Sequence, residues 1–113
     1  MSFIDELSVN FDEHLTAIQL PESAKDWGWP DVVYATPYTM DDRKAVQKFI
    51  ANDQSEAYIR IVCKKLCNED GKRMFQDSDK YALAKKTPAW LLAFVGDAIL
   101  ASESTYKAEE KND

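Results

Sequence analysis

The richest concentration of potential ligand side chains lies in CNEDGKRMFQDSD, residues 67–79. A calcium loop of the EF-hand type needs oxygen ligands at alternating positions, a glycine at the sixth position and a glutamate at the twelfth. Counted from Asn68, the glycine is fourth and the twelfth residue is Asp79, so the calcium pattern fails. Asn68, Asp70 and Gly71 instead predict a tight turn with local side-chain hydrogen bonds and a positive φ at the glycine.

Cysteine and histidine supply few ligands or nucleophiles, because the chain has two cysteines and one histidine. Cys63 and Cys67 lie four residues apart, so on a helix they share a face, and we expect them to be buried, free and reduced. Structural zinc sites usually have four ligands of these types. A catalytic cysteine needs a base that a third group holds in place, and His14 lies in a polar segment. We therefore expect no metal, no cofactor and no enzyme activity.

The composition predicts one acidic domain. The chain has 113 residues and a net charge of −6, and 45% of its residues are hydrophobic, which is enough for a modest core. A surface for duplex nucleic acid needs clustered lysine and arginine, so the charge argues against nucleic acid as a partner. No apolar run approaches the roughly 20 residues that span a bilayer, and the start lacks the pattern of a signal peptide. We expect a cytoplasmic protein that does not bind membranes.

An apolar stripe near the amino terminus predicts an amphipathic helix over residues 2–20, with Ser2 as its N-cap and Pro21 as its stop. The stripe consists of residues at helical spacing: Phe3, Ile4, Leu7, Phe11, Leu15 and Ile18. It is more apolar than a lone surface helix needs. Phe3, Leu7 and Phe11 are therefore candidate contacts with a partner or with another copy of the chain.

A small β element is expected near residues 27–38, because VVYATPYT is rich in β-branched and aromatic residues. Thr39 then predicts the N-cap of a helix with acids in its first turn. Residues 55–67 have helical spacing of apolar residues and predict a second helix.

Two further helices are expected in the last third of the chain. Asp77 or Ser78 is placed to cap a short helix, and Thr87 with Pro88 is placed to start a final apolar one. The predicted fold class is mainly α, with four to five helices and the small β element. Its domain covers residues 1–101, and residues 102–113 form a polar tail or linker.

Large aromatic side chains occur in two predicted loops. Phe75 follows the turn and precedes a helix, so we expect its ring to be buried as a plug between two helices. Trp27 and Trp29 lie in a loop punctuated by Gly28 and Pro30. Two such rings are hard to bury in a loop, and aromatic loop residues are often interface anchors. Core packing and partner binding both stay open for this pair.

The order of these motifs resembles the tail assembly chaperones of long-tailed double-stranded DNA bacteriophages. The resemblance spans residues 27–100 and rests on WGWPDVVYATPYTMDDRKAV and IVCKKLCNEDGKRMFQDSDKYALAKKTPAWL. Each piece is weak alone, whereas their order and spacing are specific. The positions that match the family pattern are Trp29, Pro37, Thr39, Asp70, Gly71, Phe75, Asp77, Asp79, Leu83 and Lys86.

The resemblance implies a non-enzymatic protein that binds the tape-measure protein, keeps it soluble and helps to recruit tail-tube subunits. It also implies work in the host cytoplasm, absence from the mature virion and self-association on a long partner. A small phage-encoded regulatory or anti-host protein is the alternative with the same composition. The position of the gene, between the tail-tube and tape-measure genes or elsewhere, distinguishes the two.

The family also implies a longer form made by ribosomal frameshifting, and the segment Glu110-Lys111-Asn112 can be encoded as GAA-AAA-AAC. That sequence contains the slippery heptamer A-AAA-AAC in the required frame. The polar tail would then join this domain to a second one that recruits tail-tube subunits. The codons for residues 110–112 and the mass of the products test this expectation.

Overall fold

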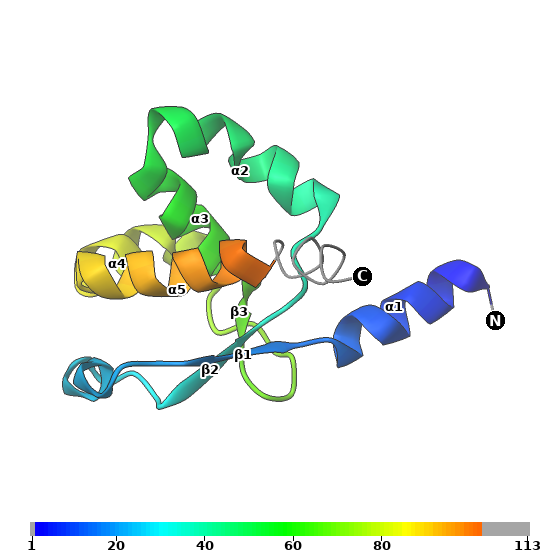
Figure 1. Ribbon diagram of the computed structural model, residues 1–113, viewed down its shortest axis with the longest axis horizontal. Coiled ribbons are helices and arrows are strands. Elements are labelled where there is room, and N and C mark those ends of the chain that lie inside the picture. Colours follow the sequence, from blue (N-terminus) through cyan, green and yellow to red (C-terminus); the bar gives the residue numbers. More distant parts are fainter. Residues whose placement is uncertain (1, 103–113) are drawn as a thin grey trace, which may run out of the picture.

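The computed structural model describes residues 2–102, and the predicted frameshift segment lies outside them. The described chain is mainly helical with a small antiparallel sheet, which confirms the predicted fold class (Figure 1). The helices and strands, in chain order, are α1 Phe3–Glu13, β1 Thr16–Gln19, the 3-10 helix η1 Glu22–Trp27, β2 Val32–Ala35, α2 Met40–Asn52, α3 Gln54–Lys65, β3 Leu66–Cys67, the 3-10 turn η2 Asp77–Asp79, α4 Lys80–Lys86 and α5 Ala89–Ala101.

The amino-terminal helix is shorter than predicted. It ends at Glu13 rather than near residue 20, and Thr16–Gln19 forms strand β1. This strand pairs antiparallel with β2, from Thr16 opposite Ala35 to Gln19 opposite Val32. The prediction was wrong because Leu15 and Ile18 also fit a helical stripe. Ile18 is buried between two exposed neighbours, as the two-residue period of a strand requires.

The sheet has the order β1-β2-β3. Strand β3 has two residues and pairs with β2 through Tyr34 opposite Cys67 and Ala35 opposite Leu66. Strand β3 follows α3 directly. The carboxyl end of α3, the central helix of the core, is therefore fixed to the sheet. Cys63 and Cys67 are buried and free, as predicted, and burial raises the pKa of both thiols.

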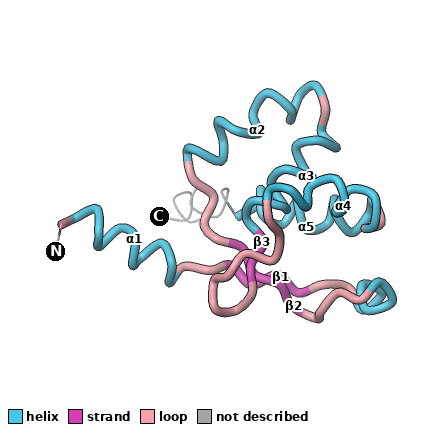
Figure 2. The backbone as a smooth tube through the Cα atoms, turned by 180° about the vertical axis from the view of Figure 1, so that it is seen from behind, coloured by secondary structure: helices cyan, strands magenta, loops and turns pink. Residues whose placement is uncertain are grey.

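Helix α3 lies at the centre and packs on α5 and α2 (Figure 2). The largest fully buried side chains of α3 and α5 are those of Ile61, Val62, Leu91, Val95 and Ile99. Gly96 allows the close approach of α3 and α5, because a Cβ there would lie 2.5 Å from Cδ1 of Tyr58. The hydroxyl of Tyr58 donates a 2.5 Å hydrogen bond to Asp97, which raises the pKa of Tyr58.

A buried ion pair joins the start of α2 to the end of α3. Thr39 caps α2 as predicted, and its backbone N–H donates to Asp42 in a capping box. The carboxylate of Asp42 lies 2.6 Å from Nζ of Lys65 and 3.0 Å from Nζ of Lys64. Burial opposes ionisation, but the hydrogen bonds from Lys65, Thr39 and Lys64 hold the pKa of Asp42 below its ordinary value.

The turn after β3 has the predicted local chemistry. The side-chain oxygen of Asn68 accepts hydrogen bonds from the backbone N–H groups of Asp70 and Lys72, and Gly71 has a φ of 82°. The predicted cap at Asp77 or Ser78 is wrong. Helix α4 begins after Asp79, whose carboxylate accepts the backbone N–H of Gln76 at 2.7 Å. The carboxylate of Asp77 instead pairs with the guanidinium of Arg73 at 2.9 Å.

Helix α1 projects from the body at the end of β1 that lies away from η1 (Figure 1). Ser2 caps it as predicted, through a capping box with Asp5. No residue of this helix is buried. Phe11, in its last turn, is half-buried, and its ring centroid lies 5.3 Å from Nζ of Lys65. Only the end of α1 nearest the sheet therefore contacts the body.

Candidate partner-binding groove

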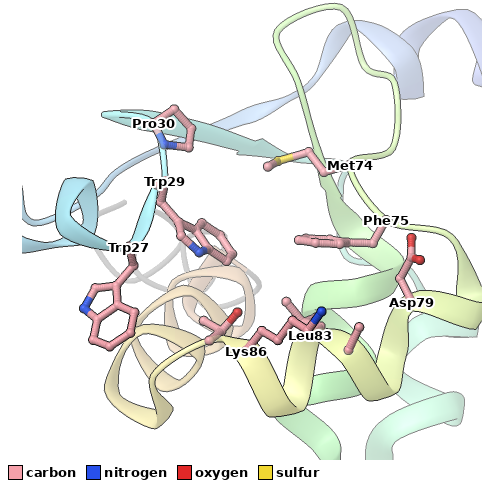
Figure 3. A pocket seen from close by; sticks show the side chains of 11 residues that line it. Trp27, Trp29, Pro30, Met74, Phe75, Asp79, Leu83 and Lys86 are labelled. Carbon is pink, nitrogen blue, oxygen red and sulfur yellow. The ribbon is translucent and has the colours of Figure 1, made fainter.

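An aromatic groove lies between the segment after η1, the segment before η2 and helix α4 (Figure 3). Its volume is about 470 Å³. Trp27 and Trp29 project from one wall, and Met74 and Phe75 project from the opposite one. Its lining residues are Trp27, Gly28, Trp29, Pro30, Met74, Phe75, Asp79, Ala82, Leu83, Lys86 and Thr87. We call this site the tryptophan groove.

The wall that carries the tryptophans is a short 3-10 helix closed by a glycine. Gly28 has a φ of 80°, a conformation that favours glycine, and its N–H donates to the carbonyl of Lys25. The N–H of Trp29 donates to the carbonyl of Ala24, which is completely buried. These bonds end η1 between the two tryptophans, and both Trp27 and Trp29 line the groove.

The two tryptophans differ in burial. Trp29 is half-buried against the core, and its ring centroid lies 6.1 Å from that of Phe75 at an interplanar angle of 44°. Such a tilted arrangement is favourable for aromatic pairs. Trp27 is 57% exposed. Trp29 therefore belongs to both core and groove, and Trp27 belongs to the surface.

Phe75 is half-buried rather than fully buried between two helices, so the plug prediction is only partly right. Its neighbour Met74 donates its N–H to the carbonyl of Leu66, which ties this wall to β3. The ring packs against the core and Trp29 and also lines the groove. It cannot be sealed between helices because the wall across from it is the tryptophan segment.

The rim of the groove carries one carboxylate and one ammonium group, those of Asp79 and Lys86. Asp79 is engaged by the N–H of Gln76. Lys85 and Lys86 form the basic last turn of α4. The groove therefore has an aromatic lining with a carboxylate at one end of the α4 face and a lysine at the other, so an acidic group of a ligand would be favoured beside Lys86.

The structure brings some predicted site residues together and separates others. Trp27, Trp29 and Phe75 meet in the groove. The remaining candidates lie elsewhere: Asp70, Gly71 and Asp77 in or next to the adjacent turn, Pro37 and Thr39 in the segment before α2, and Phe3, Leu7 and Phe11 on α1.

Sequence reasoning missed the contribution of α4 to the groove. Asp79, Leu83, Lys86 and Thr87 line it, and their spacing of four, three and one residues places them on one helical face. That spacing was the available signal. The resemblance had included three of them, Asp79, Leu83 and Lys86, without indicating that they share a site with the tryptophans.

Comparison of the chain with family models, with curated proteins and with solved structures found no match. Within residues 2–102, no helix is long and apolar enough to cross a membrane. The same part of the chain contains no group of three or more His, Cys, Asp or Glu side chains placed to hold a metal ion.

Proposed function

We propose that this protein is a phage tail assembly chaperone that binds the tape-measure protein and keeps it soluble. The observation that supports the proposal most strongly is the tryptophan groove. Five positions of the family pattern line the groove, although they come from three separate segments of the chain. They are Trp29, Phe75, Asp79, Leu83 and Lys86.

The groove suits one apolar face of a helix. Recognition of this kind uses side chains at i, i+3, i+4 and i+7 that enter a hydrophobic groove. Packing already holds the rings of Trp29 and Phe75 in place in the free protein. Binding therefore does not lose the entropy that ordering these two side chains would cost. Trp27 is exposed beside that pair and is the expected hot spot, because a tryptophan buries a large area with few rotatable bonds.

A long helical partner offers many such faces, so several copies would cover it and prevent its aggregation. In this proposal the protein acts in the host cytoplasm before the tail is complete and is absent from the virion. Recruitment of tail-tube subunits would belong to the longer, frameshifted form. No catalytic step is part of the proposal.

The test is co-expression with the tape-measure protein of the same phage. Trp27→Ala should reduce the amount of tape-measure protein that co-purifies by roughly tenfold, the loss expected when a hot-spot tryptophan is truncated. Trp90→Ala is the matched control, because Trp90 is 43% exposed on α5 and does not line the groove.

The comparison of the two variants decides the proposal. Circular dichroism should show the same helical content for both. If both variants lose the tape-measure protein equally, or if Trp27→Ala loses none, the groove is not the binding site. Failure of the unmodified protein to bind or solubilise the tape-measure protein would remove the proposed function itself and favour the regulatory or anti-host alternative.

A further inference from the structure

The outer part of α1 has an apolar face that the body does not cover. Phe3, Ile4 and Leu7 are 71%, 68% and 47% exposed. They share one side of the helix with Phe11, whose ring rests over Lys65 and thereby fixes the last turn of α1 against the body. Figure 2 shows that the helix extends from the body, and the large apolar side chains of its first two turns are exposed.

The tryptophan groove of the same chain is out of reach for this helix. Strand β1 lies between them, with α1 at its amino end and η1 at its carboxyl end. All four residues of β1 pair with β2, so the strand cannot turn back without losing its partner. Figure 1 shows α1 and η1 leaving the sheet at opposite ends. Any copy of α1 that occupies the groove must come from another molecule.

The charges of α1 and of the groove are complementary. From Phe3 to Glu13 the helix carries four acids, Asp5, Glu6, Asp12 and Glu13, and no lysine or arginine. The groove ends at Lys86, next to Lys85. Its one carboxylate, that of Asp79, lies at the start of the α4 face, so the complementarity is with the Lys85–Lys86 end of the groove. Opposite charges beside an apolar contact fix its orientation and disfavour like-charged partners.

We propose that α1 of one molecule docks with Phe3, Ile4 and Leu7 in the tryptophan groove of a second copy. The volume of the groove, about 470 Å³, is typical of ligand pockets in proteins and exceeds the volume of one aromatic side chain. The docking helix and the groove are different surfaces at opposite ends of the molecule, so the contact is heterologous. Such a contact builds open chains unless the rotation between successive copies closes a ring. This inference does not depend on the tape-measure protein.

The first test is disulfide trapping between full-length variants. Ser8 lies beside the apolar face and is exposed, and Ala82 is exposed in the groove. A mixture of Ser8→Cys and Ala82→Cys proteins should form a disulfide-linked dimer on mild oxidation, whereas either variant alone should not. The doubly substituted protein should form a ladder of multimers. The native cysteines are buried, so the unmodified chain serves as the control.

The alternative contacts give different products. Rapid dimerisation of Ser8→Cys alone would show that α1 pairs with α1, and a doubly substituted protein that forms only an internally linked monomer would show that α1 reaches its own groove. Either result would overturn the proposal.

The second test is complementation in sedimentation. The unmodified protein should associate with rising concentration, and Leu7→Ser or Trp27→Ala should each raise the dissociation constant by roughly tenfold. A mixture of these two variants retains one intact α1 and one intact groove, so it should form 1:1 dimers and no longer chains. Both side chains are exposed, which makes unfolding by these substitutions unexpected, and circular dichroism checks it. A protein that stays monomeric at high concentration, or a mixture that fails to pair, contradicts the proposal.

Discussion

The three aromatic rings of the groove have different relations to the core. Trp27 is mostly exposed, while Trp29 and Phe75 are half-buried and contact each other. Removing Trp27 deletes surface that is already in water, whereas removing Phe75 deletes a core contact and leaves Trp29 without its partner. In the proposed interaction, Trp27 would contact the partner, whereas Trp29 and Phe75 would hold the surface of the groove in place.

We expect Phe75→Ala to lower the free energy of unfolding by about 2 kcal/mol, less than the 3–5 kcal/mol typical of a fully buried ring. Trp27→Ala should change it by no more than about 0.5 kcal/mol. Urea unfolding of the two variants beside the unmodified protein measures both values. A larger loss for Trp27→Ala than for Phe75→Ala would mean that the assignment of core and surface rings is reversed.

Gly96 of α5 lies close to the ring of Tyr58 on α3. Because a Cβ at residue 96 would approach Cδ1 of Tyr58 to 2.5 Å, Gly96→Ala should cost about 1–3 kcal/mol through overpacking. The same change in a Tyr58→Ala background should cost much less, since the ring that clashes is gone. A double-mutant cycle by urea unfolding tests this coupling. Additive effects of the two substitutions would show that the helices shift apart freely.

At the level of elements, the pair Asp42–Lys65 links the start of α2 to the end of α3. Both side chains are buried, so loss of one partner leaves a buried charge. Asp42→Asn should therefore destabilise the protein by about 3–5 kcal/mol near pH 7. Asp41→Asn is the control, because the Asp41 carboxylate is 86% exposed and contacts Lys64 at 3.3 Å, and exposed pairs contribute about 1 kcal/mol or less.

The pH dependence of this pair follows from the lowered pKa of Asp42. Since the pKa is lower in the folded than in the unfolded chain, the ionised pair stabilises the fold above about pH 4. That stabilisation is lost as the pH falls toward the pKa of the folded state. The difference in unfolding free energy between the unmodified protein and Asp42→Asn should thus shrink below about pH 4. A difference that stays constant down to pH 2 would contradict the role given to Asp42.

Local signals in the sequence were sufficient for several element boundaries. Ser2 and Thr39 were predicted as caps, and each forms a capping box with the acid three residues later. Gly71 was predicted to have a positive φ for the same kind of local reason. These features depend on neighbours within four residues, which a sequence shows directly.

Features that depend on distant partners could not be predicted. Thr16–Gln19 becomes a strand because β2 is available beside it. The burial of Asp42 and Lys65 depends on how α2 crosses α3, and a charge pattern alone suggests a solvated surface. The groove forms only where three segments of the chain come together. Trp27 and Trp29 could therefore be predicted as candidates, but the contribution of α4 could not.

At the scale of the whole molecule, the two apolar surfaces of the proposed contact lie far apart. Figure 1 shows α1 at one end of the sheet and η1, whose last residue Trp27 lines the groove, at the other end. With these two surfaces at opposite ends, the molecule can present the same groove either to a helix of the tape-measure protein or to α1 of another copy. The proposed client and the proposed neighbour would therefore compete, and addition of the tape-measure protein should shorten chains of the free protein.

The two-residue strand β3 has a consequence for folding. Its pairing with β2 joins segments separated in sequence by all of α2 and α3, so closing that loop is entropically costly until the helices have packed. The contact of β1 with β2 needs only the shorter connection through η1. We expect amide protons of α3 to gain protection first in pulsed hydrogen exchange during refolding, and those at the β2–β3 junction, such as the N–H of Thr36 that donates to Lys65, to gain it last. Simultaneous protection of α3 and this junction would exclude that order. The wall of the groove that carries Phe75 is tied to β3, so the binding surface would be completed only in the final step of folding.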